Sequence, residues 1–159
     1  MTIREAGAAD HVAALAVWRA ANAAFLGDEH AGAEQEARVR KHLETPDAFL
    51  LLAEDEGRAV GTAVGMHARE DDGAGPAIPG FLHVAMVYVV PDRWGEGIGR
   101  ALTDELLAVA RRRGYVRAQL WTHAHNDHAQ RLYEGKGFVQ SGREQVVDGL
   151  RIVHYTRNL

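Results

Sequence analysis

An apolar, β-branched run that leads into three alternating glycines constrains the fold of this chain more than any other segment. The run covers residues 87–90, and the glycines are Gly95, Gly97 and Gly99, after which an amphipathic helix pattern begins. Glycine lets the backbone turn sharply, and the first turn of a helix leaves N–H groups unpaired beside a partial positive charge. Strand, glycine turn and helix start together predict an anion site, most often for phosphate.

The glycine spacing excludes two common phosphate loops. A dinucleotide loop needs G-x-G-x-x-G, but counting from Gly95 places Arg100 where the third glycine should stand. A P-loop needs Gly-Lys-Ser/Thr, and the chain has Gly99-Arg100-Ala101 instead. Taken alone, the segment also fits a glycine-rich turn that binds no ligand.

A second informative segment covers residues 126–138. Ala129, Leu132 and Tyr133 follow the spacing of one helix face. Asn126 or Asp127 can cap this helix, Gly137 ends it, and Phe138-Val139 starts a new strand.

The two segments together resemble those of the GNAT superfamily of acetyl-coenzyme A-dependent N-acetyltransferases. That family pairs an R/Q-x-x-G-x-G/A pyrophosphate loop with a later N-x-x-A-x-x-L-Y-x-x-x-G-F segment, and the second segment matches at every stated position. The first departs once, because Trp94 holds the Arg or Gln position and Arg93 precedes it. The resemblance implies that acetyl-coenzyme A contacts Val87, Tyr88, Val89, Arg93, Trp94, Gly95, Gly97, Ile98, Gly99, Arg100, Asn126 and Tyr133.

Periodicity and turn signals predict the element order β-α-α-β-β-β-α-β-α-β-β. The expected strands cover 2–6, 49–54, 60–67, 82–90, 117–123, 138–147 and 150–157. The first helix is expected to follow an Asp10 cap and the third to cover 97–113, with a polar loop at 69–80. The resemblance implies this order too, as an α/β (mixed α+β) GNAT acyl-CoA N-acyltransferase fold. Its central mixed, mostly antiparallel sheet would have about seven strands flanked by about four helices.

Length and composition fit one domain over residues 1–159. Apolar residues make up 47%, enough for a sizeable core, yet no apolar run approaches the length of a membrane span. The first residues lack a signal-peptide core and the chain has no cysteine, so a cytoplasmic protein without disulfides or a cysteine nucleophile is expected. The net charge of -4 argues against nucleic acid as a partner. The expected partners are a small-molecule or peptide amine and, in a homodimer, a second copy of the chain.

The implied reaction moves an acetyl group from acetyl-coenzyme A to a primary amine by direct attack in a ternary complex. The amine must lose a proton, an oxyanion must be stabilised and a thiolate must leave. By resemblance, freed backbone groups at Val87, Tyr88 and Val89 hold the thioester, and Tyr133 assists the thiolate. A phenol has a pKa near 10 and a thiol near 8.5, so full proton transfer from Tyr133 is uphill by about 2 kcal/mol and a hydrogen bond to the sulfur is the alternative. A tyrosine that only packs at a helix–sheet seam is the structural alternative.

His83, on the predicted central strand, is the candidate base, because an unperturbed imidazole titrates near pH 6.5. A half-buried strand histidine held by a hydrogen bond is the alternative. His123, His125 and His128 gather near a strand end, where a zinc site would need three or four convergent ligands; solvated polar side chains are the simpler interpretation, and no metal is expected.

Three interpretations follow: an active N-acetyltransferase, a non-catalytic acyl-coenzyme A sensor of the same fold, and an interaction domain with a fortuitous glycine turn. The two matching segments disfavour the third. The resemblance places two acidic loops beside the acceptor, at residues 28–30 and 70–72, where carboxylates would attract an ammonium group or simply be solvated.

Overall fold

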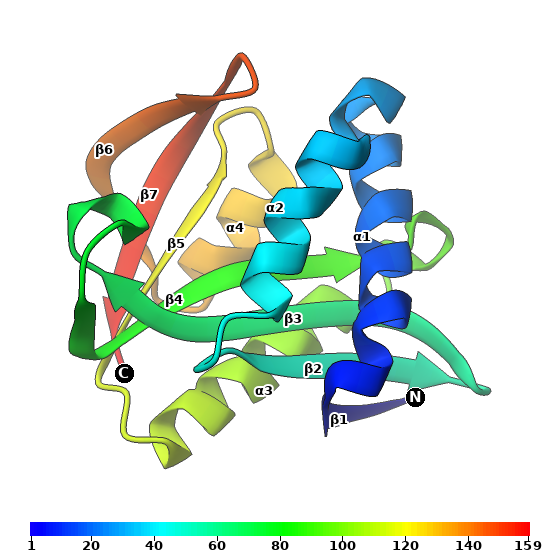
Figure 1. Ribbon diagram of the computed structural model, residues 1–159, viewed down its shortest axis with the longest axis horizontal. Coiled ribbons are helices and arrows are strands. Elements are labelled where there is room, and N and C mark those ends of the chain that lie inside the picture. The colour runs from blue at the N-terminus through cyan, green and yellow to red at the C-terminus, as the bar shows by residue number, and fades with distance from the viewer. The chain divides into compact units, whose positions relative to one another are not determined.

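The computed structural model describes residues 1–159 and contains a mixed sheet of seven strands with four α-helices (Figure 1). The strands are β1 (Thr2–Ala6), β2 (Phe49–Asp55), β3 (Arg58–Arg69), β4 (Ala77–Val89), β5 (Arg117–His123), β6 (Val139–Val147) and β7 (Leu150–Asn158). The helices are α1 (His11–Leu26), α2 (Ala33–Leu43), α3 (Ile98–Arg112) and α4 (Asp127–Gly135). The order across the sheet is β1-β2-β3-β4-β5-β7-β6, and the predicted fold class and element order are confirmed.

The chain divides into two compact units. Unit 1 consists of Met1–Met66 and Ala85–Val109, and unit 2 consists of His67–Val84 and Ala110–Leu159. Strands β3 and β4 contribute residues to both units. A single domain over the whole length stays a prediction.

Unit 1 is built on an antiparallel β1–β2–β3 sheet. β2 pairs with β1 from Thr2↔Glu54 to Ala6↔Leu50, and with β3 from Phe49↔Gly65 to Asp55↔Arg58. Helices α1 and α2 lie side by side against this sheet (Figure 1). Their apolar residues join those of the strands in one buried cluster, which comprises Ala14, Leu15, Trp18, Val39, Leu43, Leu50, Val64, Met66 and Met86.

Helix α3 approaches β3 of unit 1 closely at Gly61. A Cβ on Gly61 would lie 2.8 Å from Leu102 Cδ1, 3.1 Å from Ile98 Cγ2 and 3.3 Å from the Tyr88 carbonyl oxygen. Val64, three residues along the same strand, belongs to the cluster under α1 and α2. Because side chains alternate along a strand, α3 packs on the opposite face, behind the strands in Figure 1. Gly61 therefore sets how close the helix that follows the glycine loop comes to the sheet.

We expect Gly61→Ala to destabilise the protein by about 1 kcal/mol, although alanine normally suits a strand better than glycine does. Leu102 is fully buried and Ile98 nearly so, so neither can move aside freely. The free energy of unfolding in urea measures the effect. Gly7→Ala is the matched control, because nothing lies within 4 Å of a Cβ there. Equal stability of the two variants would contradict the close-packing account.

Unit 2 joins β4 to the C-terminal strands. Phe81–Val84 of β4 pair in parallel with Arg117–Leu120 of β5, and β7 lies antiparallel between β5 and β6. The Tyr155 hydroxyl of β7 donates to Glu134 of α4 at 2.9 Å, so α4 packs on the face that carries Tyr155 and its partner Leu120. Gln119 and His83, which are register partners, lie on the other face.

Two details of the sequence prediction need correction. Asp10 stands at the N-cap position of α1, as predicted, but its carboxylate makes no cap hydrogen bond to the helix: it pairs with Arg4 at 2.9 Å and accepts the Gly7 N–H at 3.0 Å, and these contacts lower its pKa. The polar segment predicted at 69–80 is shorter, because β3 continues to Arg69 and β4 already begins at Ala77. None of the helices combines the length and the hydropathy that crossing a bilayer requires.

Candidate active site

The glycine loop of unit 1 takes the backbone shape that its sequence predicts. After β4, a turn over Pro91–Arg93 leads into Gly95 and Gly97, both at φ +83°, and α3 starts at Ile98. A side chain at this φ is strained. A Cβ at either glycine would have no atom within 4 Å, so the loop backbone faces open space.

The start of α3 presents free N–H groups at this loop. Ala101 N–H makes the first intrahelical bond, to the Gly97 carbonyl at 3.0 Å. The N–H groups of Ile98, Gly99 and Arg100 therefore precede the helical ladder, at the positive end of the helix dipole. Ile98 is only 3% exposed and anchors the turn, whereas Arg100 is exposed. This backbone offers donors and a partial positive charge to an anion.

Trp94 holds the loop to the end of β4. Its indole N–H donates to the Val89 carbonyl at 2.7 Å, while 49% of the residue remains exposed. The side chain that stands where the family carries Arg or Gln thus bonds to the protein's own backbone. The Val89 carbonyl, in a segment predicted to face the thioester, already has this partner.

Arg93 is braced by two carboxylates. Its guanidinium contacts Glu96 at 2.8 Å and Asp55 at 3.0 Å, which raises the arginine pKa and lowers the pKa of Asp55. The bridge ties the loop to the β2–β3 turn. Because two carboxylates already offset the positive charge of Arg93, this side chain attracts a phosphate less strongly than the exposed Arg100 does.

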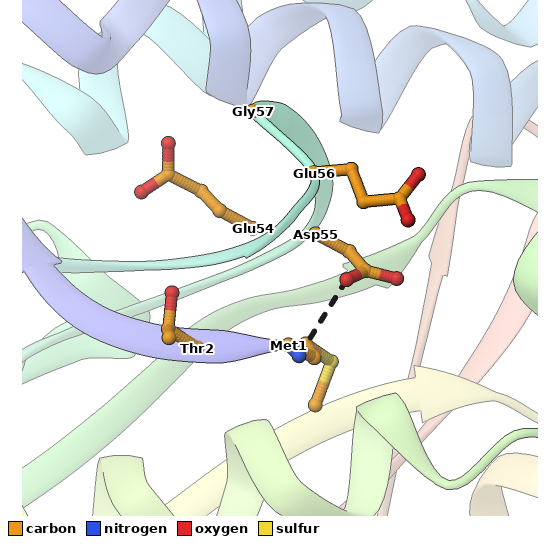
Figure 2. Close-up of a pocket in the computed structure, with 6 residues that line it drawn as sticks. All are labelled: Met1, Thr2, Glu54, Asp55, Glu56 and Gly57. Carbon is orange, nitrogen blue, oxygen red and sulfur yellow. Dashed lines mark ion pairs between the residues drawn. The ribbon is translucent and has the colours of Figure 1, made fainter.

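A surface pocket near this turn is lined by Met1, Thr2 and residues 54–57 (Figure 2). Figure 2 shows the acidic side chains of Glu54, Asp55 and Glu56 around it, and the chain's N-terminal ammonium lies 3.5 Å from Asp55 Oδ1. None of the predicted site residues lines this pocket.

Tyr88 points into the core of unit 1. Its ring packs against the cluster under α1 and α2, its hydroxyl bonds Trp18, and burial raises the hydroxyl pKa. Any contact of Tyr88 with a coenzyme must therefore come from its backbone.

Unit 2 carries the other predicted residues. Tyr133 on α4 is 9% exposed, and its ring meets Phe138 edge-on with the centroids 5.9 Å apart. His83 on β4 is half-buried, and its Nδ1 lies 3.4 Å from Gln119 Nε2. His83 and α4 occupy opposite faces of this part of the sheet.

Asn126 caps α4. Of the two predicted cap residues, Asn126 and Asp127, the first is therefore the one observed. Its Oδ1 accepts the Ala129 N–H at 3.1 Å, which leaves its amide NH₂ as the group that could contact a ligand.

We expect Asn126→Ala to lower stability by about 1 kcal/mol, because the cap is lost. Asn126→Asp keeps the cap oxygen but removes the NH₂ donor. Thermal unfolding and calorimetric titration with acetyl-coenzyme A separate the two roles. If the amide binds the coenzyme, the aspartate variant retains stability and loses affinity; unchanged affinity in both variants would leave Asn126 with the cap alone.

Sequence reasoning missed a polar group on the His83 face. It comprises Gln119, Trp121, Ser141, Arg143, His154 and Asp72. The alternation of Gln119, Trp121 and His123 along β5 was visible, but its partners depend on strand register. The rings of His123 and His125 lie 5.6 Å apart, and no group of three or more His, Cys, Asp or Glu is placed to hold a metal ion.

Residues 14–138 match the family model described as Acetyltransferase (GNAT) family. The chain belongs to this family.

Among curated proteins, the chain is 38% identical over 126 residues to a mycothiol acetyltransferase of Beutenbergia cavernae, covering 77% of this chain and 40% of that protein. It is 30% identical over 106 residues to an uncharacterized N-acetyltransferase of Mycobacterium tuberculosis, covering 67% and 62%. The chain therefore spans less than two thirds of the length of these relatives.

Among solved structures, a ribosomal-protein-alanine N-acetyltransferase of Brucella melitensis has a TM-score of 0.79 at 28% identity, with both chains fully covered. The ribosomal-protein-S18-alanine N-acetyltransferase of Escherichia coli has a TM-score of 0.77 at 20% identity over 99% of this chain and 92% of that one, a likeness of fold.

Proposed function

We propose that this chain is an N-acetyltransferase that moves an acetyl group from acetyl-coenzyme A to a primary amine. The observation that carries the proposal is the glycine loop: two glycines at φ +83° stand in open space directly before the free N–H groups of α3. A backbone of this shape fits a pyrophosphate, and family membership makes acetyl-coenzyme A its natural source.

The residues of the glycine loop have different roles in binding the coenzyme. The N–H groups of Ile98, Gly99 and Arg100 hold the phosphate oxygens, and the exposed Arg100 side chain adds the positive charge. Arg93 and Trp94 act through the loop shape, because their polar groups already bond Glu96, Asp55 and Val89. Backbone groups of residues 87–89 receive the pantetheine arm and the thioester.

His83 and Tyr133 supply the proton chemistry. His83 accepts the proton of the amine, and the Tyr133 hydroxyl hydrogen-bonds the departing sulfur. Since His83 and α4 lie on opposite faces of the sheet in unit 2, both can reach one substrate only at a strand end or an opening between strands. The family resemblance implies that the strand before the glycine loop splays from its neighbour.

The acceptor is a small-molecule amine or a peptide N-terminus. One curated relative is named for mycothiol and one solved structure for a ribosomal-protein alanine, so the first assay measures thiol release with three acceptors: an unacetylated mycothiol amine, an alanine-terminated peptide and a simple diamine. Coenzyme binding without turnover on any of them would favour the alternative, an acyl-coenzyme A sensor.

If His83 is the base, kcat/KM should fall as the pH drops through the ordinary histidine range of about 6 to 7.5, because a protonated ring cannot accept the proton. His83→Ala should lower kcat/KM and remove this limb from the pH profile. His11→Ala, a histidine change on α1 of unit 1, is the control and should keep it. The same profile in wild type and His83→Ala would assign the proton to water instead.

A further inference from the structure

Four polar side chains of unit 2, one of them His83, form one hydrogen-bonded chain. Ser141 Oγ lies 2.7 Å from His154 Nδ1, and His154 Nε2 lies 2.9 Å from Gln119 Oε1. The other end of the Gln119 amide, Nε2, lies 3.4 Å from His83 Nδ1. The residues come from β6, β7, β5 and β4, so the chain crosses four strands on one face.

The middle of this hydrogen-bonded series is held rigidly. His154 is 3% exposed, and its ring lies against Trp121 with the centroids 4.8 Å apart. The Arg143 guanidinium lies over the Trp121 ring, 5.4 Å from the ring centroid, and Arg143 forms an ion pair with Asp72. Burial, together with the Arg143 charge, lowers the pKa of His154, so this ring is neutral at neutral pH.

A neutral imidazole has one N–H and one lone pair, and a carboxamide has one donor end and one acceptor end. All the hydrogen bonds in this series must therefore run in the same direction, and only two such arrangements exist. A carboxamide also exchanges no proton near neutral pH, so the chain orients its members and does not conduct a proton.

The orientation of the Gln119 amide corresponds to one of these directions. Ser141 Oγ accepts the Arg143 backbone N–H at 3.2 Å, and in this direction its own O–H donates to His154 Nδ1. His154 then donates from Nε2 to Gln119 Oε1, and Gln119 donates from Nε2 to His83 Nδ1. In this direction the neutral His83 carries its proton on Nε2.

We propose that Gln119 is a positioning residue that sets which ring nitrogen of His83 carries the proton. With the amide as placed, His83 presents an N–H from Nε2. With the amide turned over, His83 donates from Nδ1 and presents a lone pair at Nε2. A base needs the lone pair. Under the proposed function, His83 therefore accepts a proton when the Gln119 amide has turned over, and only this consequence rests on the proposed function.

The test reads the tautomers directly from ¹⁵N ring resonances of the ligand-free protein, above the pH at which His83 is protonated. In wild type we expect His83 Nδ1 as an unprotonated acceptor nitrogen. Gln119→Glu offers only acceptor oxygens, so His83 should switch to the Nδ1–H tautomer while His154 keeps Nε2–H. Gln145→Glu makes the same charge change elsewhere in unit 2, on β6, and should leave both rings as in wild type.

An Nδ1–H tautomer of His83 together with an Nε2–H tautomer of His154 in wild type would overturn the proposal, because one amide cannot accept from both rings through opposite ends, and so would identical His83 spectra in wild type and Gln119→Glu. The wild-type spectrum decides even where a variant fails to fold. In the transfer assay Gln119→Glu should retain a kcat at least about tenfold above that of Gln119→Leu. If no acceptor is acetylated, the proposed function fails while the tautomer result stands.

Discussion

Gly99→Asp is expected to weaken acetyl-coenzyme A binding at least tenfold, about 1.4 kcal/mol, while the protein stays folded. A carboxylate in the first turn of α3 suits the helix dipole, so stability should not fall through charge. The same carboxylate repels a pyrophosphate held by the neighbouring N–H groups. Calorimetric titration and thermal unfolding, measured on the same samples, separate these effects.

Gly99→Asn is the matched control for size, because it has the shape of the aspartate without the charge. We expect its affinity to lie between those of wild type and Gly99→Asp, with the difference between the variants shrinking at high salt. Gly97→Glu should weaken binding as well, but it also strains a residue at φ +83°. Gly149→Glu, at φ +75° in open space, measures that strain away from the loop. Wild-type affinity in Gly99→Asp and Gly97→Glu would remove the pyrophosphate site.

Tyr133→Phe is expected to lower kcat about 10- to 1000-fold with a smaller change in the KM for acetyl-coenzyme A. The hydroxyl would act on sulfur only as charge develops there, so its loss affects the chemical step more than binding. The edge-on contact with Phe138 survives, because it uses the ring. Thermal unfolding of the variant checks that this ring packing is retained.

Tyr115→Phe is the comparison, since it removes a phenol hydroxyl that lies 3.1 Å from His67 Nδ1 within the same unit. That variant is expected to keep its kcat. An unchanged kcat in Tyr133→Phe would return Tyr133 to a packing role and direct attention to the sensor alternative.

Local sequence signals predicted most of the fold. The Glu56-Gly57 and Asp148-Gly149 pairs, which lie between the expected strands, adopt positive φ at both residues, as two-residue hairpin turns require. The glycine loop was predictable for a similar reason, because only glycine readily accepts the backbone of Gly95 and Gly97. These features depend on a few adjacent residues, so the sequence alone determines them.

Long-range partners could not be predicted. Asp10 follows an N-cap rule, yet Arg4 and the Gly7 N–H compete for its carboxylate once β1 places them nearby. The contacts of His83 with Gln119, and of Gln119 with His154, depend on the register of three strands, which no local pattern specifies. The ion pair between Arg93 and Asp55 likewise depends on a residue from another turn.

The bond between the Trp94 indole and the Val89 carbonyl bears on the thermodynamics of ligand binding. A loop fastened by its own side chain gives up its conformational entropy when the protein folds. A ligand that arrives later meets a preorganised backbone, so less of its interaction energy is spent on ordering the loop. Trp94 can thus strengthen binding without touching the ligand, by limiting the shapes that the empty loop explores.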